Sequence, residues 1–400
     1  MSLDLNKAIK KIEEITYLHR KEFEDREARI RLSVKHMGES TGEEIAGKLR
    51  SVSNRPFLWA GATEGLGQVY EPGPLPKAFS VASTDGSHID VDRHMPIPCA
   101  LINIGGCVIR YNLQTKSEFF NEPEVYHGEG LYLKGDTNTV DEVYIEGSTL
   151  GMLRTVGEIE YLSNILTEYQ DNSPILGLMD GSLILWQVSG PGVPQLVKRR
   201  VIDQTFIPAM DKLKNLSKTR ALAIASYISM PRSTDVVNTL RLYLCQSADE
   251  KCSGLCSIRK SLSSPCNLVN NIVDRDIFAA LLKEGQRSAI FSSTSVIMED
   301  YGNHRICFFY VNNGWEIGRV EVPQWIACNP DLLSLTHTLV LDQCRKGIGY
   351  PVAVSEAHEQ AVLTGSDRRA FQDMILAQIN NGVSSNNTSQ KDRSKRLPWL

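Results

Sequence analysis

A short pattern occurs twice in this chain: an apolar run that leads directly into Asp-Gly-Ser. The copies are residues 79–87 (Phe-Ser-Val-Ala-Ser-Thr-Asp-Gly-Ser) and residues 175–182 (Ile-Leu-Gly-Leu-Met-Asp-Gly-Ser). We interpret each as a β-strand that ends at its aspartate, because glycine permits the change of backbone direction that follows a strand. Two such carboxylates, Asp85 and Asp180, repel each other unless a cation lies between them. The pattern therefore predicts a divalent-metal site; the alternative is that each Asp-Gly is only a tight turn.

Composition places the chain among ordinary globular proteins. Its 400 residues are 42% hydrophobic and 22% charged, which is enough apolar material for a large core. The net charge of −4 argues against a uniformly basic surface. It does not exclude a local basic groove, because attraction of nucleic acid depends on where the charges lie.

The chain carries no targeting signal that we can identify. Its first residues lack a basic segment followed by an apolar one, and no run approaches 18 apolar residues. Nine cysteines, an odd number, suit a reducing compartment better than a disulfide framework. We therefore expect a cytoplasmic protein that does not enter the membrane.

Periodicity predicts three regions along the chain. Residues 1–50 form a helical arm, because apolar residues recur there at intervals of three or four. Residues 51–380 form one large α/β domain, in which strands give way to alternating helices and strands. Within it, the Ser- and Cys-rich segment 245–267 is expected to be an insertion. Residues 381–400 are polar and are expected to form a flexible tail.

A third acid is expected on the helix predicted over residues 150–170. The helix offers Glu158 and Glu160. On a helical wheel Glu160 shares an arc with small and polar residues, whereas Glu158 lies four residues after Arg154 and is suited to pair with it. We therefore favour Glu160 as the site residue and keep Glu158 as the alternative.

Two later segments carry further candidates. His358 follows a Gly-Tyr-Pro motif and could bind a metal, activate water, contact a phosphate or be structural. Arg319 and Glu321 are two residues apart on a predicted strand and so face the same side. They form either a buried ion pair or a phosphate-binding arginine held by a glutamate.

Four cysteines lie close together in sequence, and their thiols could bind Zn²⁺ or an iron–sulfur cluster. They are Cys245, Cys252, Cys256 and Cys266. The spacing lacks the usual Cys-x2-Cys pair, so a cysteine-bound metal or redox protein is a weaker interpretation. The chain also has no nucleotide-binding Gly-x4-Gly-Lys-Ser/Thr loop, no Gly-x-Ser-x-Gly elbow and no His-Glu-x-x-His pair, which argues against those enzyme classes.

Taken in order, these motifs resemble the NurA nuclease family. The resemblance runs from about residue 78 to residue 378. It is carried by the two Asp-Gly-Ser strands, the intervening helix with its glutamate, the segment Arg319-Val-Glu-Val-Pro-Gln-Trp and the late Gly349-Tyr-Pro…Glu-Ala-His358. No single motif is specific, and the resemblance depends on their order and spacing together.

The resemblance implies an RNase H-like core with a mixed five-stranded sheet flanked by helices. It implies Mn²⁺-dependent (or Mg²⁺-dependent) 5′-to-3′ exonuclease activity on DNA and endonuclease activity on single strands. It also implies a homodimer that works with a HerA-type hexameric ATPase in end resection during double-strand break repair. By position, Asp85 and Asp180 match the metal-binding acids, Glu160 (less closely Glu158) the helical acid, and His358 the late histidine.

The chain departs from the family pattern in two places. The family often has a lysine after the strand that corresponds to residues 221–230, and here Arg232 stands near that place as a candidate for substrate binding. Segment 245–267 has no counterpart that we recognise. The alternative function is a non-catalytic RNase H-like scaffold that binds a helicase or nucleic acid.

Overall fold

The computed structural model describes residues 5–50, 57–93, 95–135, 141–245 and 265–380. The chain divides into two compact units whose segments alternate along the sequence. Unit 1 comprises Met1–Pro72, Ile228–Ser295 and Cys307–Val320, and unit 2 comprises Gly73–Tyr227, Val296–Ile306 and Glu321–Leu400. The predicted domain boundaries at residues 50 and 380 stay predictions. The expected tail and most of the expected insertion lie outside the described residues.

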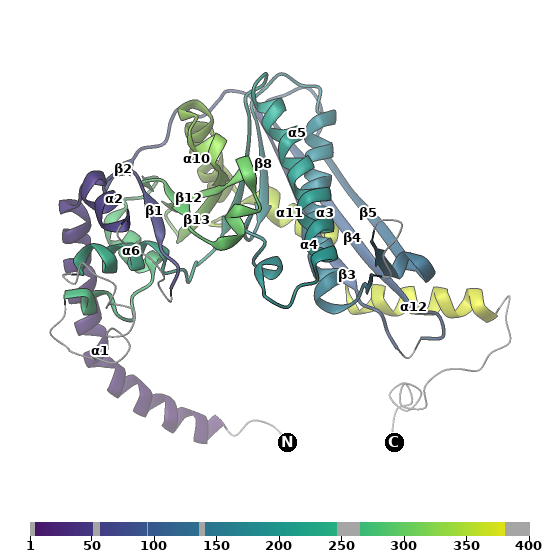
Figure 1. The fold of residues 1–400 in the computed structure, drawn as a ribbon, viewed down its shortest axis with the longest axis horizontal. Helices are drawn as coiled ribbons and strands as arrows, with labels where there is room; N and C mark the ends of the chain where they lie inside the picture. Colours follow the sequence, from purple (N-terminus) through teal and green to yellow (C-terminus); the bar gives the residue numbers. More distant parts are fainter. Residues whose placement is uncertain (1–4, 51–56, 94, 136–140, 246–264, 381–400) are drawn as a thin grey trace. The chain divides into compact units, whose positions relative to one another are not determined.

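Unit 2 is built on a mixed sheet (Figure 1). Its strands are β3 (Phe79–Ile89), β4 (Cys99–Tyr111), β5 (Glu118–His127), β8 (Ile175–Asp180) and β9 (Leu222–Ile228). They lie in the order β5-β4-β3-β8-β9. The pairs β3–β4 and β4–β5 are antiparallel, whereas β3–β8 and β8–β9 are parallel. This confirms the predicted α/β class with a mixed sheet flanked by helices.

The strand β3 does not end at Asp85, as the sequence suggested, but continues to Ile89. The long strand β4 pairs with it throughout, with Asp85 opposite Gly105. A glycine inside a strand does not end it when a partner strand continues alongside, and Asp85-Gly86 is therefore not a turn. The second copy does end as predicted: Asp180 is the last residue of β8, and Gly181 has a positive φ of 75°.

Helices cover both faces of this sheet, and alternation along β3 shows which residues face which helix. Thr84 Oγ1 donates a hydrogen bond of 2.9 Å to the carbonyl of Glu158 in α3 (Gly147–Glu168). Ser87 Oγ donates one of 2.5 Å to the carbonyl of Ala361 in α11 (Val352–Ala361). Asp85, two residues from Ser87, therefore faces the α11 side.

The remaining elements of unit 2 complete the layers. The helix expected over residues 196–216 consists of α4 (Gln195–Lys198), a π-helical segment (Arg199–Phe206) and α5 (Ile207–Ser217). α5 packs on α3, where Ser163 Oγ donates to the carbonyl of Ala209. The unit also contains α9 (Gln324–Ala327), α10 (Pro330–Lys346), α12 (Gly365–Asn380) and a small sheet of β6 (Tyr132–Lys134) and β7 (Glu142–Tyr144).

Unit 1 combines helices with short strands around an aromatic core. Its helices are α1 (Leu5–Glu39), α2 (Gly42–Arg50), α6 (Asp235–Leu244) and α8 (Asp274–Leu281). The strands β1 (Ala60–Ala62), β11 (Phe291–Ser293), β12 (Ile306–Asn312) and β13 (Ile317–Pro323) are neighbours in that order, and β2 (Val69–Tyr70) pairs with β10 (Arg287–Ser288). Phe278, Phe291, Phe308 and Tyr310 are fully buried and in mutual ring contact.

The N-terminal half of α1 leaves an apolar stripe in solvent. Leu5, Ile9, Ile12 and Ile15 recur at helical spacing, and each is at least half exposed. Along the described parts of the chain, no helix is long and apolar enough to cross a membrane.

Candidate functional site

The two repeated aspartates lie on neighbouring strands at the same level. In the parallel ladder between β3 and β8, Thr84 is opposite Met179, so the next residue on each strand is an aspartate. Because paired positions in a parallel ladder point to the same face, Asp85 and Asp180 lie side by side there. Neighbouring strands are roughly 4.8 Å apart, a separation at which two carboxylates can share a cation.

The carboxylate of Asp85 is held from both sides. Its Oδ1 accepts a hydrogen bond of 2.8 Å from the N–H of Gly86, and its Oδ2 lies 2.7 Å from Nδ1 of His358. An ionised carboxylate only accepts hydrogen bonds, so Nδ1 is the donor in this contact, and in the neutral imidazole Nε2 carries the lone pair. The imidazole is exposed, with 62% of its surface accessible, so Nε2 can reach water or a substrate.

The packing of α11 on the sheet explains why His358 arrives at this place. A Cβ atom on Gly105 would lie 2.2 Å from the backbone nitrogen of Ala361, so only glycine admits so close an approach. Asn103 Nδ2 donates a hydrogen bond of 2.9 Å to the carbonyl of Ala361. The last turn of α11 is therefore fixed to β4, one turn from the histidine.

Asp180 also has a partner that the sequence analysis did not single out. The hydroxyl of Tyr350 donates a hydrogen bond of 2.6 Å to Asp180 Oδ1. The Tyr350 ring contacts that of Tyr227 edge-on, at 5.8 Å between centroids. Tyr350 belongs to the Gly-Tyr-Pro motif just before His358, and that proximity was the only available signal for it.

The acid that approaches this pair from α3 is Glu158. Its Oε1 lies 2.7 Å from the position that a Cβ on Gly86 would take, so the glycine leaves room for the carboxylate. Glu158 is buried, and its Oε1 lies 3.6 Å from Arg154 Nε and accepts no hydrogen bond from a described residue. Burial raises the pKa of Glu158 well above its ordinary value, and the charges of Asp85 and Asp180 raise it further, while Arg154 lowers it.

The structure does not bring Glu160, the residue favoured from the sequence, to these acids. Glu160 is exposed, and its charge acts with burial and Glu124 to raise the pKa of Tyr126 on β5. Since α3 is buried around most of its circumference, small and polar neighbours do not mark the face that meets β3. The predicted Arg154–Glu158 pair does form, with 3.6 Å between Arg154 Nε and Glu158 Oε1.

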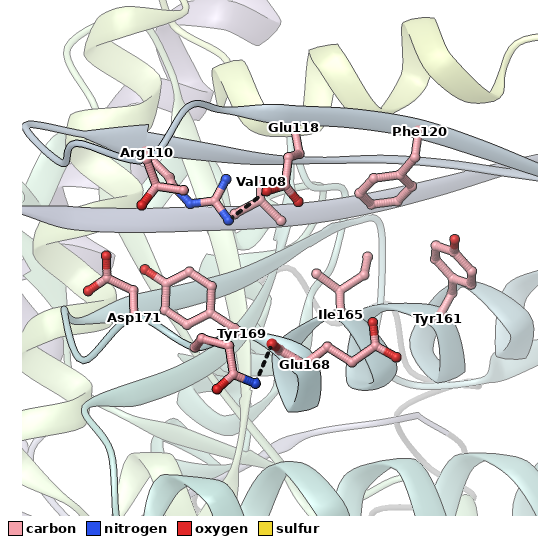
Figure 2. A pocket seen from close by; sticks show the side chains of 11 residues that line it. Val108, Arg110, Glu118, Phe120, Tyr161, Ile165, Glu168, Tyr169 and Asp171 are labelled. Carbon is pink, nitrogen blue, oxygen red and sulfur yellow. Dashed lines mark hydrogen bonds and ion pairs between the residues drawn. The ribbon is translucent and has the colours of Figure 1, made fainter.

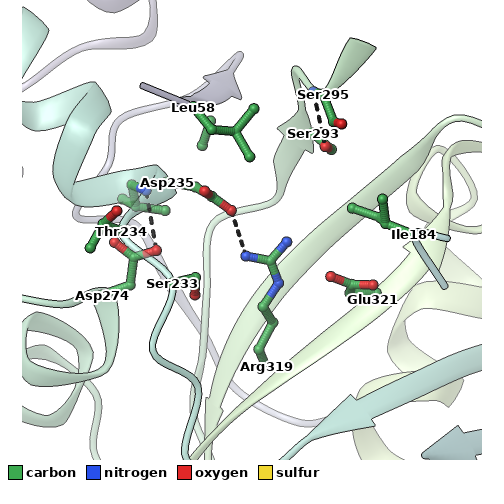
Figure 3. Close-up of polar contacts among 12 residues, drawn as sticks. Leu58, Ile184, Ser233, Thr234, Asp235, Asp274, Ser293, Ser295, Arg319 and Glu321 are labelled. Carbon is green, nitrogen blue, oxygen red and sulfur yellow. Dashed lines mark hydrogen bonds and ion pairs between the residues drawn. The ribbon is translucent and has the colours of Figure 1, made fainter. Parts of the chain in front are cut away.

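The two arginines predicted to bind substrate lie in unit 1. Arg319 is 3% exposed, and its Nη1 donates a hydrogen bond of 2.7 Å to Asp235 Oδ2 (Figure 3). Its guanidinium carbon also lies 3.6 Å from the centroid of the Phe308 ring. Arg319 therefore forms a buried ion pair with Asp235, and its role in binding phosphate stays a prediction. Arg232 is exposed after β9, and its role stays a prediction.

The structure gives no support for a cysteine-bound metal. Cys252 and Cys256 lie outside the described residues, and Cys245 and Cys266 are half-buried. Across the part of the chain that the structure describes, no group of three or more His, Cys, Asp and Glu side chains is arranged to hold a metal ion. The cysteine site stays a prediction.

The residues around Asp85 nonetheless fit a hard divalent cation that is completed by substrate. Mg²⁺ and Mn²⁺ sites in nucleic-acid enzymes use one or two carboxylates together with substrate phosphates and water. Asp85 and Asp180 supply two adjacent carboxylates, and Oε1 of Glu158 is a buried oxygen that accepts no hydrogen bond from a described residue. A cation between neighbouring carboxylates would offset their mutual repulsion.

A separate pocket of about 630 Å³ lies between the β4–β5 hairpin and the end of α3 (Figure 2). Its walls are aromatic, with Phe120, Tyr161 and Tyr169, and its rim is acidic, with Glu118, Glu168 and Asp171. Arg110 is bound there to Glu118. Three carboxylates against one arginine disfavour a phosphate, so this pocket is not the candidate site for nucleic acid.

Comparisons with known proteins agree with the fold. The crystal structure of the NurA nuclease from Sulfolobus solfataricus is similar over 96% of this chain and 99% of its own, at 10% identity and a TM-score of 0.50. A structure of NurA with manganese is similar over 92% of this chain and 99% of its own, at 13% identity and a TM-score of only 0.34. No curated protein matches the sequence.

The family comparison covers the acidic residues described above. The family model described as the NurA domain matches residues 79–363, from the start of β3 to just beyond α11. That range is most of the chain, and it contains Asp85, Glu158, Asp180, Tyr350 and His358. The chain belongs to the NurA family.

Proposed function

We propose that this protein is a metal-dependent nuclease that hydrolyses phosphodiester bonds in DNA. The observation that carries the proposal is the register of β3 and β8, which sets Asp85 beside Asp180, with His358 bonded to Asp85. The family and the likeness to a NurA nuclease support the reaction class. Adjacent acids with a histidine are also the groups that metal-assisted hydrolysis of a phosphodiester requires.

Asp85 and Asp180 would hold the cation, and Glu158 would support them from the α3 side. When bound, the cation would neutralise the scissile phosphate and lower the pKa of a coordinated water. Nε2 of His358 carries the lone pair that can accept the proton of the attacking water, and the Asp85 carboxylate stabilises the resulting imidazolium. Tyr350 keeps the Asp180 carboxylate in one orientation.

The finer properties are proposed from membership of the family. They are Mn²⁺ or Mg²⁺ as the metal cofactor, 5′-to-3′ exonuclease and single-strand endonuclease activity, and action in end resection with a HerA-type hexameric ATPase. A homodimer and contact with the ATPase both need exposed apolar surface, and the stripe of Leu5, Ile9, Ile12 and Ile15 supplies some.

The proposal is tested by incubating end-labelled single- and double-stranded DNA with the purified protein and Mn²⁺. Wild type is expected to release short products, and chelation by EDTA should stop the reaction. Asp85→Asn and Asp180→Asn should each lose about 10²-fold or more in rate, and Glu158→Gln about 10- to 100-fold.

The matched control is Glu160→Gln, which removes a carboxylate from the same helix two residues away. We expect it to cleave at the wild-type rate, because Glu160 is exposed and away from the aspartates. Cleavage that survives both aspartate substitutions would overturn the proposal, as would a wild-type protein that cleaves neither DNA with any divalent ion.

A further inference from the structure

We propose that Glu321 is a positioning residue that fixes Asp180 for cation binding. The inference rests on the proposed function, because it concerns the same acidic group. Glu321 lies in the part of β13 that belongs to unit 2 and is 1% exposed, and the strand spacing predicted it only as a partner of Arg319. Its contacts within unit 2 assign it a different task.

Glu321 holds the turn that follows Asp180. Its Oε2 accepts a hydrogen bond of 2.7 Å from Ser182 Oγ and one of 3.0 Å from the N–H of Leu183. These donors stand two and three residues after Asp180. Because the chain turns sharply at Gly181, the backbone direction there decides where the Asp180 carboxylate points.

Ser182 makes further hydrogen bonds along the same turn. Its Oγ donates to Glu321 and accepts from the N–H of Ile184 at 3.0 Å and from Nε1 of Trp186 at 3.2 Å. On the other side of the turn, the N–H of Gly181 donates to the carbonyl of Tyr227 at 3.0 Å. The residues on both sides of the turn are therefore held by hydrogen bonds.

A turn of this kind does not need a buried carboxylate. Burying a charge costs several kcal/mol unless it is well paired, and a neutral acceptor could bind the same two donors. A carboxylate adds negative charge behind Asp180, which strengthens the field that attracts a cation. Groups that hold a metal ligand commonly change metal affinity or activity by about 10- to 100-fold when substituted.

Two variants separate positioning from folding. Glu321→Gln keeps the shape and one acceptor oxygen but removes the charge. Ser182→Ala removes the hydroxyl that donates to Glu321 and accepts from Ile184 and Trp186, and it leaves the Glu321 carboxylate its bond from the N–H of Leu183. The matched control is Asp274→Asn in unit 1, a fully buried carboxylate that accepts backbone N–H bonds from Val236 and Val237. All are made in the full chain.

The measurement is Mn²⁺ binding followed by electron paramagnetic resonance of the free ion, with thermal unfolding recorded alongside. Both variants should raise the Mn²⁺ concentration at half saturation about tenfold. Asp274→Asn should lower the unfolding temperature without changing Mn²⁺ binding. If Glu321→Gln does not fold, Ser182→Ala decides the matter alone.

The result that would overturn the inference is wild-type Mn²⁺ affinity in both variants while Asp180→Asn loses binding. A tenfold loss in Asp274→Asn as well would overturn it too, because instability alone would then weaken binding. The proposed function fails differently: wild type would itself bind no Mn²⁺, or Asp85→Asn and Asp180→Asn would leave cleavage unchanged.

Discussion

Nδ1 of His358 lies 2.7 Å from Oδ2 of Asp85, although the two residues are 273 positions apart in the chain. The contact joins α11 to the middle of β3, and it fixes the tautomer of the imidazole. It also means that the late histidine and the first aspartate act as one unit. A substitution of either residue should therefore alter the hydrogen bonding of the other.

His358→Ala is expected to lower the rate of DNA cleavage by about 10²- to 10⁴-fold, the usual contribution of a positioned acid–base group. Because the side chain is mostly exposed, its loss should change the unfolding temperature little. Single-turnover cleavage assays and thermal unfolding measure the two effects. His127→Ala, at the exposed end of β5, is the control and should cleave normally. A full-rate His358→Ala protein would remove the histidine from the mechanism.

Glu158 should make the stability of the protein depend on pH. Burial raises its pKa in the folded state above the unfolded value of about 4.3, so the folded state binds the proton more tightly. The stabilisation is fully present below the unfolded pKa and is lost as the pH rises toward the folded pKa. Glu158→Gln has no such proton to lose, so it should unfold at a higher temperature than wild type at alkaline pH.

Unfolding temperatures of both proteins, measured from pH 4 to pH 9 without divalent ions, test this expectation. The difference in unfolding temperature between Glu158→Gln and wild type should increase as the pH rises. Saturating Mn²⁺ should reduce this difference, because a nearby cation offsets the buried charge of Glu158. Parallel curves throughout would show that Glu158 is not buried as a charged group.

Gly105→Ala should separate α11 from the sheet. The new Cβ would meet the Ala361 backbone at 2.2 Å, and a backbone cannot rotate aside as a side chain can. We expect a loss of about 1–3 kcal/mol in the free energy of unfolding. We also expect slower cleavage, because His358 lies on that helix. Urea denaturation measures the first effect. Gly192→Ala has no atom within 4 Å of its new Cβ and should leave both properties unchanged.

The strand patterns singled out Asp85 and Asp180 for a physical reason. Each segment is typical of a strand and leads directly into Asp-Gly-Ser, so both aspartates stood out. That the two residues lie side by side depends on the β3–β8 register, which pairs Thr84 with Met179. The sequence does not state that register.

Other parts could not be predicted because their determinants are tertiary. α3 is apolar almost all round, so only its contact with Gly86 distinguishes Glu158 from Glu160. β5 is an edge strand with mostly exposed residues, and it lacks the alternation that identifies a half-buried strand. Arg319 and Glu321 face the same side of their strand, as expected, but Asp235 and Ser182 come from distant segments.

The most direct test of the central claim is Mn²⁺ binding measured by titration calorimetry on wild type and on the Asp85→Asn, Asp180→Asn double variant. If Asp85 and Asp180 hold the cation, wild type binds Mn²⁺ and the double variant does not. The double variant should remain folded, because each substitution removes a repulsive charge. Wild-type affinity in a folded double variant would contradict the account, since the ion would then be held by residues other than these two.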